Sequence, residues 1–152
     1  MSRPGAVIVN FNAGAHLVAC VRSLRAEGID QIVVVDNASE DGSLEAAVAA
    51  DPGITVVQTG ANLGFGRAAN RGAALVEGDV LLLNPDAVVE PGAVKALEAV
   101  LEQEPEVGIV GPRTENPDGT LYPSARTFPA MGDAMGHAFI GLVAPRNRFT
   151  SR

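Results

Sequence analysis

The feature that most constrains the fold is a repeated alternation of short apolar runs with longer helical patterns. Rich in β-branched residues, the apolar runs predict strands at residues 6–11, 31–35, 54–58, 79–84 and 107–111. Helical spacing predicts helices at residues 15–27, 43–50, 64–76 and 91–104. Strands that alternate with helices in this way predict an α/β fold, with a mostly parallel sheet and helices on both of its faces.

The segment Gly78–Glu90 shows where such a fold could carry chemistry. Val80 to Leu83 is an apolar run bounded by polar residues, which suits a central strand buried on both faces. Pro85 ends the strand because it cannot donate to a ladder. Asp86 then lies at the carboxyl end, where open α/β sheets bind ligands. A carboxylate there can ligate a divalent cation that holds a diphosphate; the alternative is a helix-capping Asp in an ordinary loop.

Polar residues follow the other predicted strands as well. The strand ends carry Asn10-Phe11-Asn12, Asp36-Asn37, Thr59 to Asn62, and Asn84-Pro85-Asp86. Since the carboxyl ends of parallel strands share one edge of the sheet, these side chains predict a small-molecule site at that edge.

Gly64 to Asn70 opens the third predicted helix and fits the pattern Gly-x-Gly-x-x-Ala. A dinucleotide-binding fingerprint has this pattern but follows the first strand, so an NAD(P)-binding domain is the weaker interpretation. The stronger one is a helix N-terminus near an anionic ligand, within reach of Arg67 and Asn70. The alternative is plain helix packing, with Arg67 in solvent.

Composition excludes several classes of protein. The 152 residues carry a net charge of −7, which argues against a general nucleic-acid binder. Cys20 is the only cysteine, so no disulfide forms within the chain, and its helical position predicts a core residue. No run approaches the roughly 18 apolar residues of a membrane span. A cytoplasmic protein is therefore expected. The turn signal Asn116-Pro117-Asp118-Gly119 predicts a small hairpin near 112–122.

Taken together, these motifs resemble the family 2 glycosyltransferases of the GT-A fold, and most of all their rhamnosyltransferase branch. Order and spacing agree over residues 6–129, and the tail segment 144–147 is similar to actinobacterial members that add rhamnose to a polyprenyl-diphosphate-linked sugar. The resemblance is carried by residues 7–12, 33–43, 62–72, 82–86, 110–112, 116–119 and 122–126.

The resemblance implies an inverting, metal-assisted transfer in cell-wall assembly. It implies a dTDP- or UDP-sugar donor, dTDP-rhamnose above all, and a polyprenyl-diphosphate lipid or glycan acceptor. Asp36 would accept from the imide N–H of uracil or thymine, and Asp86, in the family's Asp-x-Asp position, would ligate Mg²⁺ or Mn²⁺. The implied nucleotide-sugar site comprises Phe11, Asn12, Asp36, Asn37, Asn62, Gly64, Phe65, Gly66, Arg67, Asn70, Asn84, Pro85 and Asp86.

Two departures from the family pattern shape the expectation for this chain. Asn84 stands in place of the first acidic residue of the metal motif. The family's general base lies in a later acidic motif, which is expected beyond Arg152. Residues 1–126 would then form the nucleotide-sugar-binding domain, and 127–152 the start of the acceptor half. The chain is expected to bind donor without transferring sugar; the alternative is a non-catalytic nucleotide-binding or interaction module.

The tail suggests a contact with the inner face of the plasma membrane. Residues 123–152 hold four of the 11 basic residues and one of the 18 acidic ones. Met131, Met135 and Phe139 share helical spacing ahead of this basic end, which predicts a peripheral contact with anionic lipid. The alternative is a helix docked on the core. Apolar surface left uncovered at the sheet edge further predicts self-association.

Overall fold

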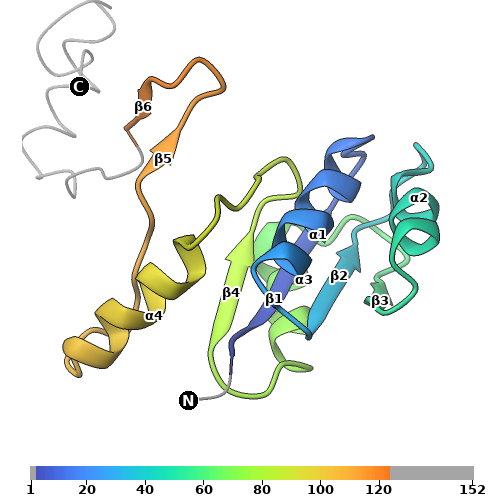
Figure 1. Cartoon of the computed structure of the whole chain (residues 1–152). Helices are drawn as coiled ribbons and strands as arrows, with labels where there is room; N and C mark the ends of the chain where they lie inside the picture. Colours follow the sequence, from blue (N-terminus) through green and yellow to red (C-terminus); the bar gives the residue numbers. More distant parts are fainter. Residues whose placement is uncertain (1–2, 124–152) are drawn as a thin grey trace, which may run out of the picture. The chain divides into compact units, whose positions relative to one another are not determined.

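The computed structural model describes residues 3–123, and the chain divides into two units, Met1–Val110 and Gly111–Arg152 (Figure 1). The strands described in the first unit are β1 (Gly5–Asn10), β2 (Ile32–Asp36), β3 (Thr55–Gln58) and β4 (Val80–Leu83). The helices between and after them are α1 (His16–Ala26), α2 (Ser43–Ala50), α3 (Phe65–Ala73) and α4 (Ala93–Gln103). The predicted α/β alternation is confirmed.

The four strands form one parallel sheet in the order β3-β2-β1-β4. Every residue of β1 and β2 is buried, as expected of apolar strands covered on both faces. From β1 the chain moves outward to β3 and then returns past β1 to form β4. The topological switch therefore lies between β1 and β4, and ligands in open α/β sheets bind outside the carboxyl ends at such a switch.

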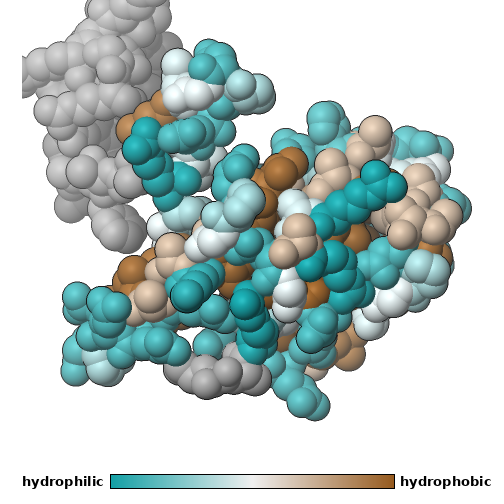
Figure 2. All heavy atoms as spheres, in the orientation of Figure 1, coloured by the Kyte–Doolittle hydropathy of each residue, from teal (hydrophilic) through white to brown (hydrophobic). Residues whose placement is uncertain are grey.

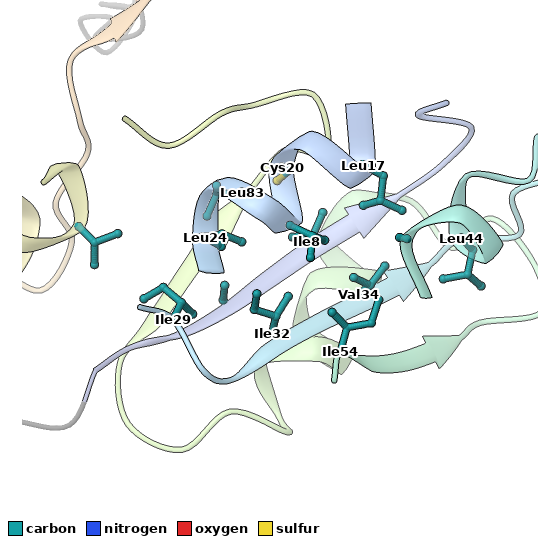
Figure 3. Packing of buried hydrophobic residues seen from close by; sticks show 14 residues of the cluster. Ile8, Leu17, Cys20, Leu24, Ile29, Ile32, Val34, Leu44, Ile54 and Leu83 are labelled. Carbon is teal, nitrogen blue, oxygen red and sulfur yellow. The ribbon is translucent and has the colours of Figure 1, made fainter. Parts of the chain in front are cut away.

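Helices cover both faces of the sheet. Successive strand residues point to opposite faces, so Ile8 and Val34 pack under α1 and α2, whereas Val7 and Val35 pack under α3. Figure 3 shows the first cluster, in which Leu17, Cys20 and Leu24 of α1 lie over Ile8 and Leu83 of the sheet. The prediction that Cys20 is a core residue is confirmed.

The carboxylate of Glu27, at the end of α1, binds the backbone at the start of α4. It accepts the backbone N–H groups of Gly92 at 2.8 Å and of Val94 at 3.2 Å. Both bonds satisfy donors that a helix start leaves unpaired, and the helix dipole favours a negative charge there. Val94 then joins the α1 core. Hydrophobic side chains also reach the surface along α4, where Val100 is 39% exposed (Figure 2).

The prediction that Val80 to Leu83 is a central strand buried on both faces was wrong. Val80 and Leu82 are 45% and 47% exposed, because β4 is an edge of the described sheet and pairs with β1 only. The packed residues of α3 contact β1 and β2. One face of β4 is therefore half covered, although its apolar run looks like that of a buried strand.

The prediction of a strand at Val107–Gly111 was also wrong. The structure has no strand there, and Ile109 is 92% exposed. Gly108 and Gly111 weaken an extended conformation, and none of the strands within residues 3–123 pairs with this segment.

The described part of the second unit, residues 111–123, is a hairpin of β5 (Thr114–Glu115) and β6 (Leu121–Tyr122), as predicted. The Asn116 N–H donates to the Thr120 carbonyl at 2.8 Å, and Gly119 takes the φ of +79° that the turn requires. The predicted domain boundary at residue 126 and the tail spacing of Met131, Met135 and Phe139 lie outside the described residues. No helix within residues 3–123 has both the length and the apolarity to cross a bilayer.

We expect Gly72→Ala to destabilise the fold. A Cβ at Gly72 would lie 2.5 Å from Val7 Cγ1 and 2.8 Å from Val35 Cγ2, so α3 must move off the sheet. Overpacking of this kind costs about 1–3 kcal/mol, measurable as a lower urea midpoint. Gly66→Ala in the same helix is the matched control: its Cβ meets nothing within 4 Å, so it should be neutral or stabilising by up to about 1 kcal/mol. Equal stability of the two variants would contradict the packing argument.

Candidate functional site

The last residues of β1 and β2, Asn10 and Asp36, are paired in register and buried. Asn10 Nδ2 donates to Asp36 Oδ1 at 2.9 Å and also lies 2.9 Å from Ser43 Oγ and 3.0 Å from Ser39 Oγ. The backbone N–H of Ser39 donates to Asp36 Oδ2 at 3.1 Å. Each oxygen of the Asp36 carboxylate thus accepts a hydrogen bond from the protein, at the carboxyl end of a central strand.

The loops that follow β1 and β2 are tied to each other through Asn12. Its N–H donates to Ser39 Oγ at 3.1 Å, and its Oδ1 accepts the Glu40 N–H at 2.9 Å. Asn12 and Ala38 have φ values of +53° and +68°. Asn tolerates this left-handed conformation, whereas in Ala it costs about 1–2 kcal/mol. Strain held at a strand end in this way is typical of functional sites.

Asp41 joins the start of α1 to the start of α2. Its Oδ1 accepts the Ser43 hydroxyl at 2.6 Å, and its Oδ2 accepts the Gly14 N–H at 2.7 Å. The Ser43 hydroxyl, together with the backbone donors, holds the pKa of Asp41 below its ordinary value. Gly42 occupies the N-cap position of α2. Asp41, the residue before it, accepts the backbone N–H of Ser43.

Asn37 points to the opposite face from Asp36 and anchors the loop that leads to α3. Its Oδ1 accepts the Leu63 N–H at 2.9 Å, and its Nδ2 donates to Asn62 Oδ1 at 2.9 Å. Asn62 Oδ1 in turn accepts the Gly64 N–H. Strand alternation therefore sends Asp36 toward α2 and Asn37 toward α3, and both loops are set by the end of β2.

The start of α3 presents small residues. Gly64, at its N-cap, has φ +78° and ψ +159°, a region open essentially to glycine alone. A Cβ at Gly64 or Gly66 would meet nothing within 4 Å, so the backbone is open to close approach there. Phe65 is 47% exposed, and Arg67 and Asn70 are exposed on the same helix.

Asn84, Pro85 and Asp86 follow β4, across the topological switch from the end of β1. The Asp86 side chain is exposed. No group of three His, Cys, Asp or Glu side chains that could hold a metal occurs within residues 3–123. A single carboxylate does fit Mg²⁺, which is commonly held by one or two carboxylates together with substrate phosphates and water. A cation here would thus take its other ligands from a bound diphosphate and solvent.

The thiol of Cys20 lies beneath this turn. Cys20 Sγ donates to the Asn84 carbonyl at 3.6 Å. Burial, with the nearby Asp86 charge as the smaller cause, raises the pKa of Cys20 to about 12. The thiol is therefore protonated at neutral pH and acts as packing and support for the β4 turn.

Eight of the predicted site residues fall into two groups along one sheet edge, while Phe11 is an exposed side chain just after β1. Hydrogen bonds connect Asn12, Asp36, Asn37, Asn62 and Gly64, directly or through the loop after β2. Asn84, Pro85 and Asp86 reach the same edge through the pairing of β4 with β1. Within residues 3–123 no hydrogen bond joins the two groups, and ligand binding by any of these residues stays a prediction.

Several residues that organise the site were absent from the implied nucleotide-sugar site, although Asn10 was named among the polar residues at the strand ends. Asn10, Ser39, Asp41 and Ser43 form the polar cluster around Asp36. The parity of the strand positions could have identified Asn10, because Asn10 and Asp36 each end a strand and point to the same face. No sequence signal fixed the serines, whose places depend on the loop conformation.

Residues 6–147 match the family described as "Glycosyl transferase family 2". The chain is 36% identical over 159 residues to N-acetylglucosaminyl-diphospho-decaprenol L-rhamnosyltransferase of Mycobacterium tuberculosis, from strains CDC 1551 and H37Rv. That alignment covers 95% of this chain and 52% of the relative, so the chain spans about half the length of the curated relatives it matches.

Among solved structures, the fold is similar to that of S. aureus TarS 1–349, alone and in complex with UDP. Both have a TM-score of 0.58 and 21% sequence identity, and the match covers 65% of this chain and 32% of TarS. At this level of identity the similarity concerns the fold.

We expect Cys20 to be unreactive in the folded protein. A buried thiol with a pKa of about 12 supplies almost no thiolate at pH 8, whereas an unfolded cysteine has an ordinary pKa near 8.5. Labelling by a disulfide reagent should therefore be complete in urea and slow without it, with a rate that follows global unfolding. Because Cys20 is the only cysteine, the signal has one source. Equal labelling rates with and without urea would contradict the buried position.

The raised pKa also fixes a sign for pH dependence. A thiol stabilised in its protonated form favours the folded state below the unfolded pKa, and this contribution is lost as pH rises above about 8.5. Cys20→Ala should lose that part of the alkaline dependence of the urea midpoint.

Proposed function

The chain belongs to glycosyl transferase family 2, and on that premise we propose that it binds a nucleoside diphosphate sugar along the carboxyl edge of its sheet. In this proposal the chain serves as the donor-binding part of an inverting rhamnosyltransferase that uses dTDP-rhamnose as its donor. The support is the GT-A type of sheet, its polar edge at the topological switch, and the 36% identity to a rhamnosyltransferase.

The observation that carries the proposal is the Asp36 carboxylate. It is 6% exposed, yet its two oxygens accept hydrogen bonds from Asn10 and Ser39 rather than an ion pair. A carboxylate fixed by two donors still has acceptor lone pairs to offer. Uracil and thymine carry an N–H at N3 that matches this acceptor, so Asp36 would read the base of a UDP- or dTDP-sugar.

The diphosphate and the sugar would lie between α3 and the end of β4. Gly64 and Gly66 leave the backbone of the α3 N-terminus open, and such a terminus favours a negatively charged ligand. Arg67 and Asn70 are exposed within the same helix and could contact the phosphates or the sugar. Phe11 and Asn12 would flank the nucleotide from the end of β1.

Asp86 would hold a Mg²⁺ or Mn²⁺ ion against the donor diphosphate. When bound, the ion neutralises the charge that develops on the leaving nucleoside diphosphate. This chain contributes one carboxylate, at a turn supported by the Cys20 thiol. Asn84, in place of a second acid, adds no charge, so most other ligands would come from the phosphates and water.

The acceptor in this proposal is a polyprenyl-diphosphate-linked sugar or a glycan, by analogy with the relative's name. Inverting transfer requires a base that takes the proton from the acceptor hydroxyl. None of the residues placed at the donor edge fills that role in the proposal; the base is expected in a later motif, as in the family.

Asp36→Ala should weaken the binding of UDP and dTDP by about 1–3 kcal/mol, the scale of a hydrogen bond to a charged group. Isothermal titration calorimetry measures the change. Asp30→Ala is the matched control: Asp30 is an exposed carboxylate near the amino end of β2, and its replacement should leave affinity unchanged. A folded Asp36→Ala with wild-type affinity would remove Asp36 from the base site. NAD is titrated in parallel, and a preference for NAD would point to a dinucleotide-binding domain.

Mn²⁺ or Mg²⁺ should tighten UDP binding in the wild type and not in Asp86→Ala. The control is Asp79→Ala, which removes an exposed carboxylate just before β4, at the opposite end of the strand. Titrations with and without the metal give the enhancement for each protein. An enhancement that persists in Asp86→Ala would place the metal ligand elsewhere.

A further inference from the structure

We propose that Asn10 is a positioning residue that fixes the Asp36 carboxylate and thereby sets the selectivity of the site for bases with an N–H at N3. This inference rests on the proposed function. Asn10 is fully buried at the end of β1, opposite Asp36 in the register, and has no route to a ligand of its own. It would therefore act through Asp36.

The hydrogen-bond directions around Asn10 are set by its neighbours. Ser43 donates its hydroxyl hydrogen to Asp41 Oδ1 at 2.6 Å, so Ser43 Oγ is an acceptor toward Asn10 Nδ2 at 2.9 Å. Asp36 Oδ1, a carboxylate oxygen, accepts the other Asn10 hydrogen at 2.9 Å. Ser39 Oγ, at 3.0 Å from Nδ2, competes for the same two hydrogens. The amide is thereby oriented with its donor group toward Asp36.

The amide oxygen of Asn10 shows that this orientation costs folding free energy. Asn10 Oδ1 is buried and has no hydrogen-bond partner among the described residues. Burying an unpaired acceptor is destabilising, so an apolar residue would serve the core better. What Asn offers at this position, and Leu or Val cannot, is a neutral donor directed at the Asp36 carboxylate.

The Asn10 donor determines which nucleobases can pair with Asp36. Both protein partners of Asp36, Asn10 Nδ2 and the Ser39 N–H, donate to it, so the carboxylate presents only acceptor lone pairs. The N3 position of uracil and thymine carries a hydrogen and pairs with such a group. Cytosine has an acceptor lone pair at N3 and is repelled by it. Asn10 thus holds Asp36 in the orientation and hydrogen-bonding state that favours uracil or thymine over cytosine.

The test converts the donor into an acceptor of the same size, Asn10→Asp. Two carboxylates at the distance of Asn10 Nδ2 and Asp36 Oδ1 cannot both be charged and would share one proton. When CDP binds, the shared proton can move to the Asp36 oxygen that faces the base and donate to N3 of cytosine, whereas uracil needs that oxygen as an acceptor. We expect the ratio of UDP to CDP affinity to fall at least roughly tenfold, the effect of one hydrogen bond gained or lost. Calorimetry at pH 6, 7 and 8, with UDP and CDP at matched metal concentration, measures the ratio.

The pH dependence separates positioning from a structural role. In Asn10→Asp the ratio should rise with pH as the shared proton is lost, and in the wild type it should stay flat. Asp41, connected to this pair through Ser43, has a lowered pKa and is already charged in this range. Glu40 and His16 are exposed on the neighbouring segments, and the loop 59–64 on the other side contains no titratable residue. Their effects are common to both proteins and cancel in the comparison.

Arg25→Ala is the control for a general loss of stability. It breaks the 2.6 Å ion pair with Asp51, which joins the C-terminal ends of α1 and α2 away from the site. It should lower the urea midpoint and leave the UDP to CDP ratio unchanged.

Three outcomes are decisive. A folded Asn10→Asp with the wild-type ratio at all three pH values would overturn the inference while leaving the proposed function intact. If that variant does not fold, Asn10→Ser, which is uncharged and too short to hold Asp36, should lower the ratio at least roughly fivefold; an unchanged ratio would overturn the inference. Failure of the wild type to bind either UDP or dTDP would overturn the proposed function and this inference together.

Discussion

The parallel pairing of β1 with β2 is the constraint on which the rest of the first unit depends. Both strands are buried along their whole length, and their register places Asn10 beside Asp36. Because side chains alternate between the faces, the same register sends the apolar residues under α1 and α2 on one side and under α3 on the other. Core packing and the polar strand end are therefore two results of one alignment, and neither can shift without the other.

Much of this arrangement follows from sequence patterns that act locally. The strands β1, β2 and β3, the four helices and the turn at Asn116–Gly119 depend on nearby residues, and each lies within a few positions of its prediction. The environment of β4 and the segment Val107–Gly111 could not be predicted in the same way. Whether an apolar run is covered or paired depends on neighbours in space, and for Leu82 and Ile109 the described neighbours do not supply that cover.

In the candidate site, too, some features follow from local sequence patterns and others depend on neighbours in space. Asp36, Asn37 and Asp86 could be placed at the sheet edge because each follows a recognisable strand. The contacts that Ser39 and Ser43 make with Asn10 could not be predicted, since they depend on a loop that holds Ala38 in a left-handed conformation, which its sequence does not favour. Local rules fail here where polar interactions outweigh local preference, as is common at functional sites.

The edge position of β4 has a consequence for how the sheet can grow. Among the described strands β4 pairs on one side only, so the backbone groups of its other side can accept a further strand. A strand added there, from any source, would run directly beside the Asn84–Asp86 turn. Its side chains would become neighbours of Asp86 without any change in β1 to β4. New polar side chains could thus be placed beside Asp86 by extension of the sheet, while the end of β2 at Asp36, two strands away from β4, stays as it is.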